Sequence, residues 1–326
     1  MNRFVKNLSP DQQLSLLFVT VLVLLLLASS VLFLLSLRER AEDDPVRLRL
    51  ERVREALTRT WVLMGLVWLG LALGPTGATL LVALGSLLVL REFISLTPTR
   101  RADHRALVAV FFGVLPAQYG LLLNGHYDLF SVFIPVYVFL ALPALGALGN
   151  DPKGFLERQA TLQWGVMVCV YGLSHVPALL VLQVPGAEGR SGFLVFYLVA
   201  VVQSCMVVQH VAGRWLARPP HLPAISDGFH ATSWALGVLA GGLVGGLLSG
   251  LTPFKPGQAL GMALIACCAG TLGHLVMKAI KRDRGVPHWG GQGRSVTGAS
   301  GLLDRVDALC FAAPVLFQSV RWYFGN

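Results

Sequence analysis

Charged side chains are scarce in this chain. Only 13% of its 326 residues are charged, whereas 55% are hydrophobic and the mean hydropathy is +0.66. A soluble domain carries about 25% charged residues, so this composition excludes an ordinary soluble fold. Open sheets leave backbone groups unpaired in lipid, which means that spanning segments must be helices. The sequence therefore predicts an all-α polytopic membrane protein.

Cysteine is rare as well, and its spacing argues against redox and zinc motifs. None of the five cysteines belongs to a CxxC pair, and most lie inside apolar runs, where cysteine acts as a small buried apolar residue. Acidic residues number only 17 against 26 lysines and arginines, which gives a net charge of +9. This excess suits anionic lipid headgroups or phosphorylated substrates. No basic module stands apart from the apolar runs, so we expect no nucleic-acid partner.

Long apolar runs dominate what is present. The first, Leu14–Leu37, is longer than the roughly 7–15 apolar residues of a cleavable signal peptide, so we expect it to remain as a span. A later run is interrupted by Gly74-Pro75-Thr76-Gly77. At roughly 20 residues per crossing, the runs predict about nine transmembrane helices. They cover 14–37, 61–90 in two parts, 106–123, 129–149, 162–184, 193–212, 233–251 and 257–280, and a tail, 308–320, is too short to span.

The basic residues fall into clusters that predict a topology. Nine spans with an outside N-terminus place every cluster on one face, and the positive-inside rule makes that face cytoplasmic. We therefore expect a multi-pass inner-membrane protein, folded as a single integral domain over residues 1–326. The clusters cover residues 38–59, 91–105, 153–158, 214–218 and 278–305.

Two segments carry patterns of structural meaning. Residues 38–60 place apolar side chains at helical spacing among arginines, which indicates an interfacial amphipathic helix or, alternatively, a solvated connector. Residues 233–251 carry two interleaved Gly-x3-Gly series, 237/241/245 and 242/246/250. Such glycines allow helix backbones to approach closely, so we expect a tightly packed helix there.

A polar stretch near the C-terminus offers candidate chemistry. Asp304 and Asp307 share one face of a helix because they are three residues apart. Magnesium usually binds through one or two carboxylates plus substrate phosphates, and phosphoryl transfer needs cations such as Lys281, Arg282 and Arg305. By spacing alone, this stretch is either a metal and phosphate platform or an ordinary basic loop.

The motifs themselves resemble a known family. Gly273-His274 is followed by Lys281-Arg282-x-x-Gly285-Val286 and then by Gly301-Leu302-Leu303-Asp304-Arg305-Val306-Asp307. This order is similar to the C-terminal signature of the phosphatidate cytidylyltransferases, also called CDP-diacylglycerol synthases. The resemblance implies a polytopic enzyme that uses CTP, Mg²⁺ and phosphatidate to make CDP-diacylglycerol and pyrophosphate. It also implies a homodimer, with residues 190–326 as the catalytic-type region.

The resemblance assigns roles to individual residues. Catalytic positions are Lys281, Arg282, Asp304, Arg305 and Asp307, and the last two aspartates of this motif, Asp304 and Asp307, are its metal positions. Substrate binding is implied for Ser226 and Arg214, together with the lysine and arginine already named.

The chain also departs from the family pattern. Family aspartates correspond to His274 and Met206, the family Lys-Asp pair to Pro287-His288, and a family histidine to Ala299. The sequence therefore predicts a family member of phospholipid metabolism with lost or much reduced activity, a pseudoenzyme candidate. An active phosphatidate cytidylyltransferase and a lipid transporter-like protein on the same bundle are the alternatives.

Several histidines add one more alternative. His210, His230, His274 and His288 lie in or beside the candidate site, but their spacing matches no known ligand pattern, so a transition-metal site is a minor hypothesis. His175 lies inside a span, where an ionisable side chain is a functional hypothesis by default.

Overall fold

The described chain is helical. The computed structural model describes residues 10–36, 54, 57, 61, 65, 68–70, 72–97, 99–184, 189–215, 220–226, 228–286, 289 and 301–324. Within these residues the only β pairing is an isolated antiparallel bridge between Leu222 and Ser226, so the all-α prediction is confirmed. Two compact units make up the chain, Met1–Ala78 and Thr79–Asn326.

The first unit contains the long helix α2, Pro10–Ser36. Leucine and phenylalanine side chains such as Phe33 and Leu34 are more than 60% exposed along it, as expected for a helix that faces lipid. The indole Nε1 of Trp61 donates to Ser29 Oγ at 3.0 Å within this unit. The predicted interfacial segment 38–60 lies outside the described residues apart from Arg54 and Leu57, so it stays a prediction.

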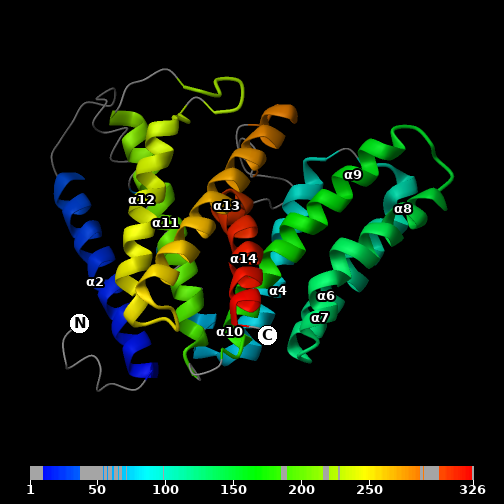
Figure 1. Ribbon diagram of the computed structural model, residues 1–326. Helices are drawn as coiled ribbons and strands as arrows, with labels where there is room; N and C mark the ends of the chain where they lie inside the picture. Colours follow the sequence, from blue (N-terminus) through cyan, green and yellow to red (C-terminus); the bar gives the residue numbers. More distant parts are fainter. Residues whose placement is uncertain are drawn as a thin grey trace. The chain divides into compact units, whose positions relative to one another are not determined.

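The second unit is a bundle of long helices (Figure 1). Three of its spans contain a π-helical turn. Helix α4 begins in the first unit and ends in the second. In chain order the elements are α4 Gly74–Ser95; η1 Arg101–Asp103, α5 His104–Ala109, η2 Val110–Val114 and α6 Leu115–Leu123; α7 Tyr127–Val132, η3 Phe133–Val138 and α8 Phe139–Ala147; α9 Phe155–Val166, η4 Met167–Gly172 and α10 Leu173–Val181; α11 Ser191–Trp215; α12 Ala231–Leu247 and η5 Leu248–Gly250; α13 Pro256–Asp283; and α14 Leu303–Phe324.

Within the described residues, 8 helical segments are long and apolar enough to cross a membrane. They are Ser15–Ser36, Gly74–Ser95, Arg101–Leu123, Tyr127–Ala147, Phe155–Val181, Ser191–Gly213, Ala231–Gly250 and Pro256–Asp283. The chain is therefore a multi-pass membrane protein. The remaining predicted span, the first part of the 61–90 run, lies where only some residues are described. The apolar tail 308–320 is part of α14, which is not among the 8 and packs inside the bundle.

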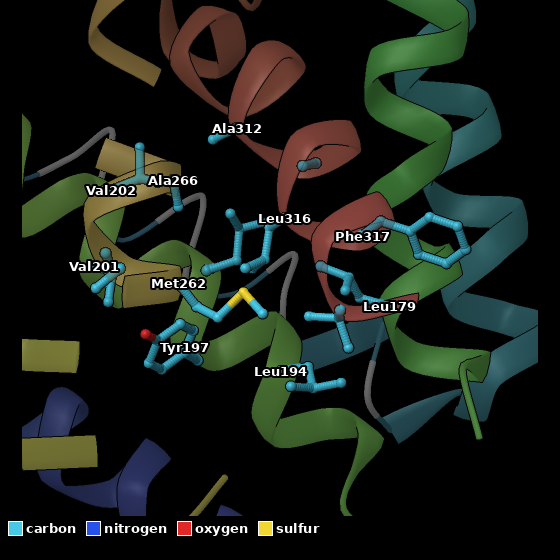
Figure 2. Close-up of a cluster of buried hydrophobic side chains, with 14 of the residues drawn as sticks. Leu179, Leu194, Tyr197, Val201, Val202, Met262, Ala266, Ala312, Leu316 and Phe317 are labelled. Carbon is cyan, nitrogen blue, oxygen red and sulfur yellow. The ribbon is translucent and has the colours of Figure 1, made fainter. Parts of the chain in front are cut away.

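A buried cluster joins α10, α11, α13 and α14 (Figure 2). Tyr197 of α11, Ala266 of α13 and Leu316 of α14 are fully buried within it. Figure 2 shows Met262 and Leu316 directed toward the same interior space between these helices. Because α14 contributes small and large apolar residues to the centre of this cluster, most of the tail is held by packing inside the bundle.

One of the two glycine series on α12 explains its close packing. A methyl group at Gly237 would lie 2.7 Å from the carbonyl oxygen of Cys205 on α11, and one at Gly241 would collide with Cys267 on α13. By contrast, Gly246 of the second series has open space around it. The prediction of a tightly packed helix is confirmed: the series 237/241/245 makes the closest contacts, and a methyl group at Gly242 of the second series would also lie close, 3.1 Å from Leu260.

Polar contacts bring alternate helix ends of the second unit to one end of the bundle. Glu92 near the end of α4 contacts the start of α14. Arg284, just after α13, pairs with Glu157 near the start of α9, at 3.6 Å. Arg158 of α9 pairs with Asp103 of η1 at 3.0 Å. Three of the predicted basic clusters, 91–105, 153–158 and 278–305, therefore gather at this end, which is called the polar end below.

Candidate functional site

The candidate site lies at the polar end, where the last turns of α13 meet the first turns of α14 (Figure 1). His274, Lys278 and Lys281 follow one another on α13 at intervals of four and three residues, so they share one face of that helix. Asp304 and Asp307 share a face of α14 in the same way. The structure brings the two faces together through the pairs His274–Asp307 and Lys281–Asp304, although more than 20 residues separate the two groups in sequence.

His274 and Asp307 form the closest contact across the two helices. Nδ1 of His274 lies 2.7 Å from Oδ2 of Asp307, and the aspartate is only 3% exposed. The other carboxylate oxygen, Oδ1, accepts the backbone N–H of Ala308 at 2.7 Å. Both oxygens of this buried carboxylate are therefore already engaged by groups of the protein.

Lys281 and Asp304 form a second pair one turn closer to the helix ends. The ammonium group of Lys281 donates to Oδ1 of Asp304, and Oδ2 accepts the backbone N–H of Trp289 at 3.0 Å. Trp289 is fully buried and its ring packs against Phe93 with centroids 5.3 Å apart. Trp289 is thus held beside the start of α14. Pro287, His288, and residues 290–300 with Ala299 lie outside the described residues.

Lys278 reaches the segment between α11 and α12. Its Nζ donates to Ser226 Oγ at 3.1 Å, and Ser226 is buried. The isolated bridge from Leu222 to Ser226 closes that segment into a turn. The predicted substrate residue Ser226 therefore lies beside the α13 face that carries the site.

Three other predicted residues are less closely tied to these contacts. Arg282 is exposed in the last turn of α13, and Arg305 is partly buried in the first turn of α14. Arg214 lies in the last turn of α11, but its side chain is outside the described part of the chain.

Glu92 is a structural residue that the sequence prediction left without a role. Its Oε2 accepts the backbone N–H groups of Leu302 and Leu303 at 3.0 Å and 3.4 Å, and the side chain is only 3% exposed. The first N–H groups of a helix have no partner inside the helix, and a carboxylate there also suits the helix dipole. Glu92 thus positions the start of α14, and with it Asp304 and Asp307. The sequence feature that could have identified Glu92 is a single acidic residue at the end of an apolar run.

A model of the cytidylyltransferase family matches residues 54–323, which includes every residue of the site. The chain belongs to the cytidylyltransferase family. Its predicted resemblance to the phosphatidate cytidylyltransferases is therefore confirmed. The chain is also 32% identical over 311 residues to the Escherichia coli K12 protein described as "Uncharacterized protein YnbB", covering 93% of this chain and 97% of that protein.

The acidic residues of this cytidylyltransferase-family protein can be tested for their fit to magnesium. Enzymes of the family are typically metal-dependent, and magnesium requires oxygen ligands in near-octahedral geometry. Among the described residues no group of three or more His, Cys, Asp or Glu side chains could hold a metal ion. As arranged, Asp307 faces an imidazole and Asp304 an ammonium group, so the pair does not fit a magnesium ion.

The histidines of the cytidylyltransferase-family site do not form a metal cluster within the described residues. His210 is exposed on α11, whereas His230 is buried where α12 begins and its carbonyl accepts from Ser233 Oγ. Met206, which the resemblance matches to a family aspartate, packs against the buried cluster that contains Tyr197 and Leu316.

His175 lies away from the site. Its Nδ1 contacts the carbonyl of Tyr171 at 2.7 Å, and its ring packs against Phe130 and Phe317. This histidine is therefore part of an aromatic cluster inside the bundle.

Proposed function

We propose that this chain is a phosphatidate cytidylyltransferase-like protein of phospholipid metabolism whose metal-dependent cytidylyl transfer is lost or much reduced. It binds an anionic phospholipid at the α13–α14 site, and the family resemblance identifies that lipid as phosphatidate. By the positive-inside rule, the polar end faces the cytoplasm, and the membrane is the inner membrane.

The observation that supports this proposal is the contact between His274 and Asp307. An imidazole occupies the position of a family aspartate and engages Asp307 at 2.7 Å. Imidazole suits zinc, copper or iron better than magnesium. Phosphoryl-type transfer depends almost entirely on positioning and electrostatic stabilisation. Losing a carboxylate at this position, and a second one at Met206, removes the groups that would hold a divalent cation against the phosphates.

Binding of a phosphate does not require those carboxylates. Lys278, Lys281 and Arg282 place three basic groups on the last two turns of α13. Lys278 also contacts Ser226, whose hydroxyl group can donate to a phosphate oxygen. Binding of the lipid phosphate therefore rests on residues that this chain retains.

A second candidate function is an active phosphatidate cytidylyltransferase. The observation in its favour is that Lys281, Asp304 and Asp307, all matched to the family motif, lie at one place in the fold. In that case magnesium would have to displace Lys281 from Asp304 when CTP binds.

One experiment distinguishes the two functions. Purified full-length protein in detergent receives labelled CTP and phosphatidate with Mg²⁺, Mn²⁺, Zn²⁺ or EDTA, and CDP-lipid is measured. Phosphatidate binding is measured on the same sample by native mass spectrometry. Bound phosphatidate with little or no CDP-lipid under every condition supports the first proposal. Robust CDP-lipid formation that Asp304→Asn abolishes would overturn it and establish the second. Absence of both binding and turnover would contradict both.

A further inference from the structure

A basic depression lies at the polar end, away from the contacts of the α13–α14 site. It has a volume of about 660 Å³ and is bordered by the start of the Arg101–Leu123 span and by the loop that joins α8 to α9. Arg100, Arg101 and Arg105 line it, with Asp151 as its one acidic residue. No residue of the C-terminal motif, Gly273 to Asp307, lines this depression.

The wall of the depression is built on a buried ion pair. Arg158 of α9 pairs with Asp103 at 3.0 Å, and both side chains are at least 93% buried. Arg158 also donates to the carbonyl of Asp151 at 2.9 Å, and Asp103 accepts the backbone N–H of Arg100 at 3.0 Å. These bonds hold the segment before α5 and the loop before α9 against each other, so the depression is part of the fold.

The charges around the depression do not cancel. Asp151 is paired with Arg100 at 3.3 Å and with Arg158 at 3.5 Å. Arg101 and Arg105 are exposed, and within the described part of the chain neither makes an ion pair. They lie four residues apart, so both guanidinium groups can approach one anion from the same face of the helix start. A guanidinium group can donate two parallel hydrogen bonds to two oxygens of one phosphate, which favours a phosphate as the ligand.

The position of the depression favours a lipid as the source of that phosphate. Arg101 is the first residue of one candidate membrane span, and Leu148 and Gly149 directly follow another. Leu148 is 67% exposed at the border, as a residue that faces acyl chains would be. Basic residues at span ends lie at the depth of the phospholipid headgroups.

We infer that the depression lined by Arg101 and Arg105 is a binding site for the headgroup phosphate of an anionic phospholipid of the surrounding leaflet. The site is separate from the α13–α14 site, so this inference goes beyond the proposed function and does not rest on it. Its ligand is held by the protein at the membrane boundary and takes no part in a reaction.

The test compares variants that remove the same charge from opposite ends of the bundle. Arg101→Gln/Arg105→Gln removes two charges from the depression. Arg190→Gln/Lys255→Gln removes two charges from the starts of α11 and α13, at the other end. Each full-length protein is mixed in detergent with defined amounts of phosphatidylglycerol and phosphatidylcholine, and retained lipid is counted by native mass spectrometry. We expect the first variant to lose about tenfold or more of its preference for phosphatidylglycerol over phosphatidylcholine. The reason is that each basic group near an anionic headgroup contributes to the free energy of binding.

The controls make each outcome decisive. Equal preference in wild type and the first variant, or an equal loss in the second variant, would overturn the inference. Arg101→Lys/Arg105→Lys keeps the charge and should keep most of the preference, which excludes a mere folding defect.

A second arm offers inorganic phosphate and CTP in place of lipid. If these soluble phosphates bind as tightly as the lipid in an arginine-dependent way, the assignment to a lipid is wrong. CDP-lipid formation is not a readout here, so failure of this inference and failure of the proposed function are distinguishable.

Discussion

His274 and Asp307 lie 2.7 Å apart across the contact between α13 and α14, and the aspartate is buried. The resemblance matches His274 to a family aspartate, so we propose that this contact replaces a carboxylate pair of the family motif. It fixes the register of two helices at the polar end while occupying the oxygens that a metal ion would need.

Restoring acid residues should restore an affinity for metal. The double variant His274→Asp/Met206→Asp puts carboxylates at the two positions that the resemblance matches to family aspartates, and oxygen ligands are what Mg²⁺ and Mn²⁺ prefer. We expect Mn²⁺ binding by electron paramagnetic resonance in the double variant and none in the wild type at the same concentration. The control is His274→Asn, which removes the imidazole without adding charge. Equal Mn²⁺ binding by wild type and double variant would contradict the account of the site.

Removing the charge of Glu92 should destabilise the start of α14. Its Oε2 accepts two backbone N–H groups, at Leu302 and Leu303, and bonds to a charged acceptor contribute more than neutral ones. We expect Glu92→Ala to lower the free energy of unfolding by about 1–3 kcal/mol. Glu92→Gln keeps an acceptor and should lose less.

The control for Glu92 is Glu157→Gln. Glu157 lies at the same end, but it is mostly exposed and its pair with Arg284 is long at 3.6 Å. An exposed pair of this kind contributes about 0–1 kcal/mol, so this variant should unfold close to the wild type. Equal denaturation midpoints for Glu92→Ala and Glu157→Gln in detergent would refute the role of Glu92.

The 8 spans found among the described residues were predictable from the sequence because long apolar runs favour lipid, whereas the starts of some helices were not. The apolar run that predicts the fifth candidate span begins at Leu162, yet the helix begins at Phe155. Its first turns carry Arg158, which is buried because Asp103 neutralises it. A charge near the start of a helix suggests solvent until its partner, 55 residues away, is known.

The sequence predicted which residues belong to the candidate site, but not which of their side chains contact each other. The motif places Asp304 and Asp307 on one face, and it identifies Lys281 as a neighbouring cation. Which carboxylate meets which base depends on the rotation of α13 against α14, and packing sets that rotation. Gly273, for example, leaves space that the ring of Phe311 fills. Local spacing holds no information about such contacts, and the same limit concealed Glu92, which lies 210 residues from Leu302.

The buried pair of Arg158 and Asp103 should show strong coupling. Arg158→Met leaves a buried carboxylate without its partner, which costs about 3–5 kcal/mol. Replacing both partners, Arg158→Met with Asp103→Leu, should restore part of that loss because no unpaired charge remains. The measurement is a double-mutant cycle by denaturant unfolding in detergent. Additive effects of the two single variants would show that the pair contributes no coupling.

Two glycines of α12 provide a matched test of its packing. Gly241→Val would force a side chain against Cys267, whereas Gly246→Val adds the same side chain in open space. We expect the first variant to lose about 1–3 kcal/mol or more, the usual cost of overpacking, and the second to stay near the wild type. Thermal unfolding in detergent compares the two directly. A larger loss for Gly246→Val would show that the other glycine series faces the neighbouring helices.

The most direct test of the central claim is the rate at which purified wild-type protein forms CDP-lipid from labelled CTP and phosphatidate with saturating Mg²⁺. The contact between His274 and Asp307 predicts a rate at or near background, unchanged by Asp304→Asn, from a protein that nevertheless retains phosphatidate. A robust rate that Asp304→Asn abolishes would contradict the claim, because it would show that magnesium reaches these carboxylates despite His274 and Lys281.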